Sequence, residues 1–269
     1  MTAAVRVIYV VPVGAEPWAE AELRATAVLE DIQWFFAEEM NRLGHGLKTF
    51  DIATAADGSL LFHQIDSPLS QEQFIHASRK QYQARCRSAA KLRGLCDNND
   101  ITVYFVEAYS IINGKVSGAQ ALGWSRNGGE AFLSSLHLKM ARREWIGNEN
   151  GYESEVFDWI DSQPMRRGTL SWNKRGTQLG DVSGAGFGII AHEVGHSFAL
   201  PKQEKMRPGR KGPLMGNGCR GMRGYFRPDL TEDRCLLREQ DGMVLSHSDL
   251  FALRNLKPKS ISFSGEVEK

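Results

Sequence analysis

One short stretch of the chain brings together His192, Glu193 and His196. Residues 189–201 read Ile-Ile-Ala-His-Glu-Val-Gly-His-Ser-Phe-Ala-Leu-Pro. An α-helix repeats about every 3.6 residues, so both histidines would lie on one face with the glutamate beside them. Two imidazoles one turn apart suit a zinc ion, and the neighbouring carboxylate can reach a water at the metal. The stretch therefore predicts a helix that carries a metal centre.

The surrounding sequence predicts where this helix begins and ends. A run of small residues at 181–188 precedes the motif, in which Asp181 or Ser183 can serve as the N-cap, and Pro201 stops the helix after His196. The helix also has an apolar flank, made of Ile189, Ile190, Val194 and Phe198. The alternative interpretation is a buried helix whose histidines only form ordinary hydrogen bonds.

With these residues in view, the chain resembles the zincin metallopeptidases, and among them the metzincins. Their pattern extends His-Glu-x-x-His by x-x-Gly-x-x-His and later places a methionine-bearing turn beneath the metal. Residues 213–218, Pro-Leu-Met-Gly-Asn-Gly, resemble that turn, with Met215 as its methionine. The resemblance implies a zinc cofactor held by His192 and His196, with Glu193 as general base and acid. It also implies hydrolysis of peptide bonds in a peptide or protein substrate.

Two positions depart from the family pattern. Ala199 replaces the glycine, and Lys202 replaces the third histidine. A left-handed alanine costs roughly 1 to 2 kcal/mol, so we expect the turn after the helix to be made differently. A lysine ligand would need its pKa lowered from about 10.4 to about 7, which costs roughly 4.6 kcal/mol. Lys202 is therefore not expected to bind zinc.

The third zinc ligand must then come from another residue, because a catalytic zinc usually has three protein ligands and a water. Glu204 is nearest in the sequence, and the sequence does not rank the other candidates, which are His247, Asp249, Asp229, Glu232 and Asp233. The same departures favour a second hypothesis, a catalytically inactive zincin-like binding domain that recognises a protein or glycan through the same cleft.

Upstream of the motif, strands and helices alternate. Residues 101–106, Ile-Thr-Val-Tyr-Phe-Val, are the best candidate for a central strand because they are apolar on both faces. The order predicts an α/β (α+β) fold, with a mixed, twisted sheet backed by helices and then the active-site helix, the Met-turn and a C-terminal helix. The other predicted elements are strands at 5–11, 47–52 and 60–65, a helix at 17–43 with Pro17 in its first turn, and a helix from a capping box at Ser70 and Gln73 to near Gly94.

A glycine-rich turn at 126–129 precedes the segment 130–136. In similar enzymes the strand before the active-site helix lies at a sheet edge, where an extended peptide adds as a further strand. The alternative is an ordinary edge strand without a ligand. Trp145, Trp159 and Trp172 lie in a polar stretch that either covers the site or packs in the core.

Length and composition fit one catalytic domain over residues 1–269, with an N-terminal subdomain at 1–200 and a C-terminal subdomain at 201–269. The 42% hydrophobic content supports a large core, and a net charge of +1 gives no general attraction to nucleic acid or to an anionic membrane. No apolar run reaches about 18 residues, and the start of the chain does not resemble a signal peptide, so export is expected only if a signal was removed. The sequence does not determine the oligomeric state or the disulfide state of Cys86, Cys96, Cys219 and Cys235.

Overall fold

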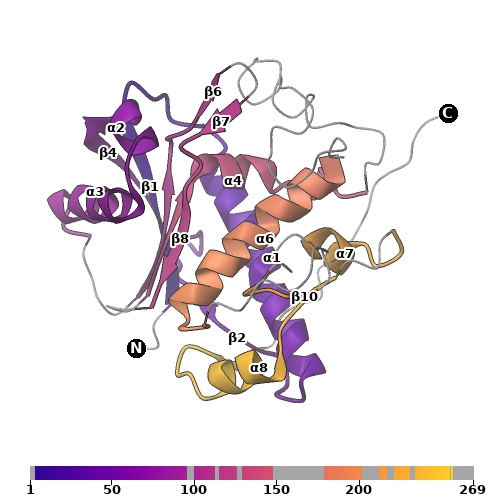
Figure 1. Ribbon diagram of the computed structural model, residues 1–269. Helices are drawn as coiled ribbons and strands as arrows, with labels where there is room; N and C mark the ends of the chain where they lie inside the picture. Colours follow the sequence, from indigo (N-terminus) through magenta and orange to yellow (C-terminus); the bar gives the residue numbers. More distant parts are fainter. Residues whose placement is uncertain are drawn as a thin grey trace.

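The computed structural model describes residues 4–95, 100–112, 115–125, 129–147, 179–201, 212–216, 221–230, 234–254 and 256. Strands and helices alternate through the first half of the chain (Figure 1). The elements in this half are β1 (Ala4–Val13), α1 (Ala21–Arg42), β2 (Lys48–Thr49), β3 (Asp51–Ile52), β4 (Phe62–Ser70), α2 (Gln71–Ile75), α3 (Arg79–Leu92), β5 (Ile101–Val106), β6 (Ser110–Ile112), β7 (Lys115–Ser117), β8 (Ala121–Trp124), β9 (Glu130–Ser134), α4 (Ser135–Met140) and the 3-10 turn η1 (Arg143–Trp145).

The described residues of the second half are mainly helical. Its longest described element is α6, which crosses the front of the sheet in Figure 1. The elements here are α6 (Leu179–Ser197), β10 (Gly212–Pro213), α7 (Met222–Phe226), β11 (Cys235–Leu236), α8 (Glu239–Ser246) and β12 (Ala252–Leu253). Within the described parts of the chain, no helix is long and apolar enough to cross a membrane.

The main sheet has six strands in the order β3-β1-β5-β9-β8, and β4 pairs with β1. All neighbouring pairs are parallel except β8 with β9, which is antiparallel and places Gly123 opposite Ala131. The sheet is therefore mixed, as predicted, and β8 forms one edge. The prediction of residues 101–106 as a central strand is confirmed, because β5 lies between β1 and β9.

Alternate residues of β1 point to opposite faces of the sheet, and each face is covered by helices. Val7 and Tyr9 belong to the larger core cluster, which also holds the buried sides of α1 and α6. Ile8 and Val10 belong to a second cluster, which holds the buried sides of α2 and α3. This double cover explains why the strands read as nearly continuous apolar runs.

Two helix boundaries differ from the sequence prediction. The first helix begins at Ala21, so Pro17 lies before its first turn. The predicted capping box at Ser70 and Gln73 is present, but the helix that it starts ends at Ile75. Ser78 and Gln81 form a second capping box, which starts α3. A capping box satisfies backbone amides that have no partner at the start of a helix. Two such boxes start two helices here, where a single helix was expected.

The run of small residues before the motif lies inside α6, which begins at Leu179, so neither Asp181 nor Ser183 is the N-cap. Ser183 is therefore an interior residue, and its hydroxyl bonds to the backbone of Arg142, so the expectation that it caps the helix is wrong. Asp181 lies in the first turn. A Cβ on Gly184 would lie 2.7 Å from the amide nitrogen of Arg223, and one on Gly186 would lie 2.8 Å from that of Ala141. The glycines thus allow α7 and the end of α4 to approach α6 closely.

The C-terminal segment is attached to α1 through a buried carboxylate. Glu39 is fully buried, forms an ion pair with Arg42 at 2.7 Å, and accepts a hydrogen bond from the amide of Leu237 at 2.8 Å. Arg42 in turn donates to the carbonyl of Leu237 at 2.6 Å. Because β11 immediately precedes Leu237 and pairs with β10, this contact helps to fix the turn that follows β10.

Candidate metal centre

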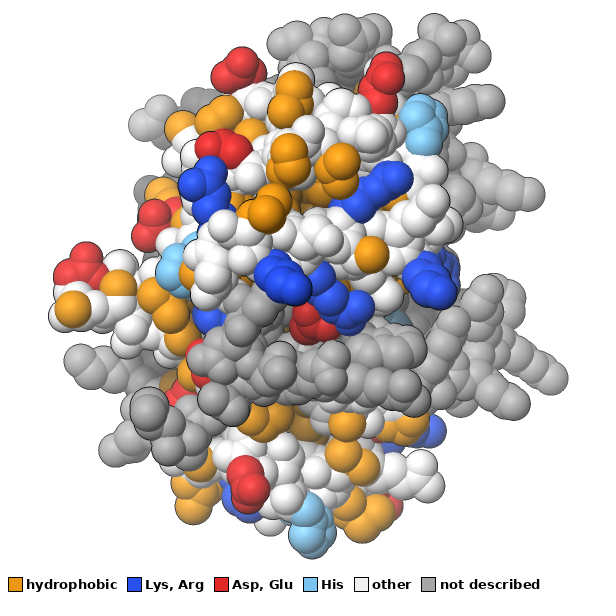
Figure 2. All heavy atoms as spheres, turned by 90° about the vertical axis from the view of Figure 1, so that its left-hand side faces the viewer, with side chains coloured by type: hydrophobic (Ala, Val, Ile, Leu, Met, Phe, Trp, Pro, Cys, Tyr) orange, Lys and Arg blue, Asp and Glu red, His pale blue; other side chains and the backbone are white. Residues whose placement is uncertain are grey.

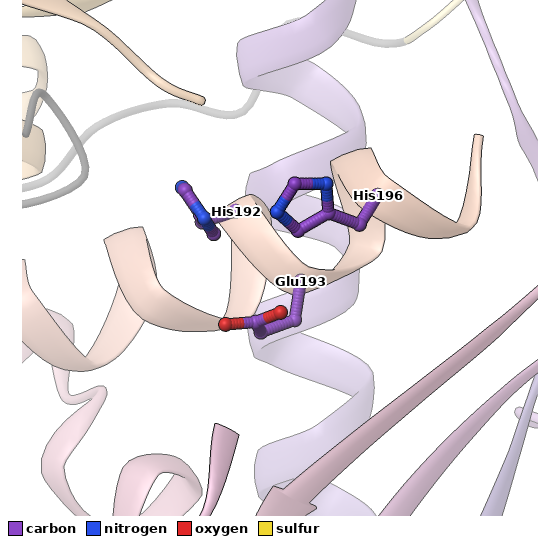
Figure 3. A group of neighbouring side chains, drawn as sticks. All are labelled: His192, Glu193 and His196. Atoms are coloured by element: carbon purple, nitrogen blue, oxygen red, sulfur yellow. The ribbon is translucent and has the colours of Figure 1, made fainter. Parts of the chain in front are cut away.

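The C-terminal half of α6 carries the three residues that the motif predicted to lie together. Ligand atoms of His192, Glu193 and His196 all lie within 4.8 Å of one another. Figure 3 shows both imidazole rings on one side of α6, with the Glu193 carboxylate on the adjoining side. The ring centroids are 4.7 Å apart, and both histidines are half-buried while Glu193 is buried. The two imidazoles are able to hold a metal ion such as zinc, with the Glu193 carboxylate beside it.

Backbone carbonyls orient both rings. Nδ1 of His192 lies 2.7 Å from the carbonyl oxygen of Leu214, and Nδ1 of His196 lies 2.9 Å from that of Leu200. A carbonyl only accepts hydrogen bonds, so each Nδ1 carries the proton and each Nε2 carries the lone pair. Metal-binding histidines are usually fixed in this way, which means that both rings fit a metal on their Nε2 side.

The turn after α6 has the left-handed residue that the family pattern requires, although it is not a glycine. Ala199 has φ of 67°, and it is the one non-glycine with positive φ among the residues described. Its amide bonds to the carbonyl of His196, and the amide of Leu200 bonds to that of Gly195, which is a Schellman C-cap. The expectation of a differently made turn is therefore wrong. The turn directs the Leu200 carbonyl back to His196, and this contact depends on the strained conformation.

Met215 lies directly against α6. A Cβ on Gly195 would stand 2.7 Å from Sδ of Met215, whose side chain is fully buried. Gly195 lies between Glu193 and His196 in α6. The methionine therefore packs against the part of the helix that carries the site. The preceding residue, Leu214, supplies the carbonyl for His192. The turn that contains Leu214 and Met215 thus contacts both the backbone of α6 at Gly195 and the ring of His192.

Strand β8 touches the same part of α6 from the sheet side. A Cβ on Gly123 would lie 2.3 Å from the carbonyl oxygen of Glu193 and 2.4 Å from Cβ of His196. Only glycine permits this approach. Sequence reasoning did not identify Gly123, although an isolated glycine within a strand often marks close contact with another backbone. The sheet edge at β8 therefore borders the candidate site. The segment 130–136 was expected to form that edge, but its residues 130–134 form β9, which lies inside the sheet between β5 and β8.

The structure does not bring the described third-ligand candidates to the site. His247 is exposed at the end of α8, where its Nδ1 contacts the carbonyl of Met243 at 2.8 Å. Asp249 is exposed, and Asp229 is paired with Arg227 at 2.6 Å. In the described ranges, no further His, Cys, Asp or Glu joins the group on α6. Other sequence predictions fall outside the described residues, namely those on Lys202, Glu204, Glu232, Asp233, Trp159, Trp172, Cys96 and Cys219.

Comparison with known proteins identifies structural neighbours. No family model and no curated protein matches the sequence. OgpA from Akkermansia muciniphila, in a catalytically inactive form in complex with an O-glycopeptide substrate, glycodrosocin, matches with a TM-score of 0.59 and 14% identity, over 98% of this chain and 63% of that one. Two structures of wild-type OgpA match with TM-scores of 0.55 and 0.57 at 15% identity, each over 94% of this chain and 62% of OgpA.

These matches show that the chain shares the fold of OgpA and spans less than two thirds of its length. The predicted fold class, a mixed sheet backed by helices, is confirmed.

Proposed function

We propose that this chain is a zinc-dependent peptidase. The observation that carries the proposal is the group on α6, in which two imidazoles with their Nδ1 atoms held by carbonyls lie beside a buried carboxylate. His192 and His196 bind the zinc ion. The match to OgpA, one structure of which contains an O-glycopeptide substrate, supports a peptide or glycopeptide as the substrate.

In this mechanism Glu193 transfers the protons. When bound, zinc supplies Lewis acidity, which lowers the pKa of water and polarises the substrate carbonyl. The Glu193 carboxylate accepts a proton from the attacking water while the oxygen of that water forms a bond to the substrate carbonyl carbon. Glu193 then delivers that proton to the leaving nitrogen as the C–N bond breaks. Glu193 is buried, and its backbone carbonyl packs against β8, which positions the residue for both steps.

The substrate lies along β8 in this proposal. β8 is the last strand of the sheet, and Gly123 brings it into contact with the site on α6. An extended peptide can add to such an edge through main-chain hydrogen bonds. We further propose that the turn at Met215 serves as the Met-turn of the metzincin pattern, because it packs against Gly195. Glu204, the nearest in the sequence, is retained as a candidate third ligand, with Glu232 and Asp233 as alternatives.

The proposal is tested by metal analysis and a matched pair of variants. We expect near-stoichiometric zinc, loss of peptide cleavage on chelation and recovery on adding zinc. Glu193→Gln should abolish cleavage and leave zinc content and unfolding unchanged, whereas Glu38→Gln, which changes a carboxylate on α1, should leave cleavage intact. Undiminished cleavage by Glu193→Gln would reject the assignment.

The second candidate is a binding domain without activity, favoured by Lys202 in place of the third histidine. Its expected signature is saturable binding of glycopeptides without cleavage and without zinc, even after growth in zinc-rich medium. Glu204→Gln separates the two cases further. It should weaken zinc binding by about 10-fold or more if Glu204 is a ligand, and it should have no effect on metal-free glycopeptide binding.

A further inference from the structure

Helix α3 carries a concentration of positive charge that the metal centre does not use. Every charged side chain from Arg79 to Arg93 is a lysine or an arginine, although the whole chain has a net charge of only +1. Figure 2 faces this side of the molecule and shows Lys and Arg side chains gathered across its middle. The members are Arg79, Lys80, Arg85, Arg87, Lys91 and Arg93.

The helix repeat brings part of this charge into one stripe. Lys80, Arg87 and Lys91 are spaced by seven and four residues, so they share one face of α3. The small residues Ala84 and Ser88 lie between them and are exposed, which leaves the stripe open. At about 1.5 Å per residue, the stripe extends over roughly 16 Å. It can therefore contact several charges of an extended ligand at once.

The fold pairs some of these cations and leaves others without a partner. The first turn of α3 has no acidic residue, and Arg79 and Lys80 lie there against the positive end of the helix dipole. Arg87 is paired with Glu130 at 2.5 Å and Arg93 with Asp66 at 3.6 Å. Within the described residues, Arg79, Lys80 and Lys91 have no hydrogen-bond or ion-pair partner. Their positive charge is available for an external ligand.

We propose that the exposed face of α3 binds an anionic polysaccharide. The apolar side of α3 is buried against the sheet, and Leu92 at its end is an isolated exposed apolar side chain, which is too little to enter a bilayer. The stripe lacks the aromatic side chains on which single-stranded bases stack. Gln83 and Ser88 lie next to the cations, and their amide and hydroxyl groups can hydrogen bond to sugar hydroxyls. Sulfate or carboxylate groups of the polysaccharide pair with Lys80, Lys91 and Arg79.

The test is a titration of the full chain with heparin, with neutral dextran as the reference polymer, between about 50 and 200 mM salt. We expect heparin to bind and dextran not to bind. The double variant Lys80→Gln, Lys91→Gln should bind on the order of tenfold more weakly at the lower salt concentration, with a log-log salt slope reduced by about two. Glutamine is a good helix former, and an unchanged unfolding midpoint will show that α3 is intact.

The matched control is Lys48→Glu, which lowers the net charge by the same amount on β2, away from α3 (Figure 1). It should leave heparin binding unchanged, as should Glu193→Gln, which separates this proposal from the proposed peptidase activity. Equal weakening by Lys48→Glu, or no binding of heparin at low salt, would overturn the proposal. Tighter binding of duplex DNA, polyglutamate or phosphatidylserine vesicles than of heparin would also overturn it.

Discussion

The contact between Gly123 and α6 gives the sharpest test of how the sheet positions the site. In Gly123→Ala, the added methyl group would lie 2.3 Å from the Glu193 oxygen, 2.4 Å from His196 Cβ and 3.1 Å from the Glu193 carbonyl carbon. Carbon atoms pack at about 3.5 to 4.0 Å, so β8 and α6 must separate by about 1 Å. These neighbours belong to the helix backbone and its first side-chain atom, and they cannot rotate away.

The expected consequence is a loss of both stability and function. Overpacking of this kind costs about 1 to 3 kcal/mol of unfolding free energy, which urea denaturation will measure. A displacement of about 1 Å at a catalytic group lowers kcat/KM on the order of 100-fold. Zinc affinity, measured by competition with a chelator, should fall as well, because His196 moves with the helix.

Gly186→Ala is the matched control, because it adds the same methyl group to α6 itself. That group would meet the amide nitrogen of Ala141 at 2.8 Å and the carbonyl oxygen of His137 at 3.0 Å, on the side of the helix that packs against α4. We expect a comparable loss of stability with zinc affinity retained. If Gly123→Ala has the same unfolding free energy, zinc affinity and peptide cleavage as the parent protein, β8 does not support the site as described.

Further predictions concern strain and buried charge. Ala199→Gly should raise the unfolding free energy by about 0.5 to 1 kcal/mol, since it relieves the left-handed alanine but adds backbone entropy; a decrease would contradict the strain at φ 67°. Burial lowers the pKa of His137 to about 4 despite its bond to the Ser134 carbonyl, so the unfolded chain binds the extra proton first as the pH falls. Stability should therefore be complete above about pH 6.5 and fall by roughly 3 kcal/mol towards pH 4, a loss that His137→Gln should remove from urea curves. Lys139→Met should cost about 3 to 5 kcal/mol, because it leaves Glu107, now paired with Lys139 at 2.6 Å, as an unpaired buried charge. Much of that loss should return when Glu107→Leu is added, and no recovery would show that the pair is not the cause.

Local patterns predicted the features that depend on neighbouring residues. His192 and His196 lie one turn apart on a helix, so their spacing alone was enough to predict that they share a face. The buried strand β5 and the capping box at Ser70 were predictable for the same reason. The contacts of Nδ1 with the carbonyls of Leu200 and Leu214 were not, because no side-chain pattern encodes the direction of a backbone carbonyl.

Predictions failed where distant contacts outweighed local preference. Asp181 and Ser183 are residue types that favour N-caps, so the helix was expected to begin at one of them. It begins at Leu179, and its glycines pack closely against α4 and α7. Local sterics likewise argued against a left-handed Ala199, whereas the Schellman turn that holds His196 requires it.

The sequence by itself determined the donor set, its placement on one helix and the alternation of strands and helices, since all of these follow from periodicities of a few residues. Only the tertiary structure decided that Gly123 and Met215 both pack against that helix and that the cations of α3 face outward. Contacts between segments far apart along the chain depend on how whole elements pack, and no short-range pattern contains that information.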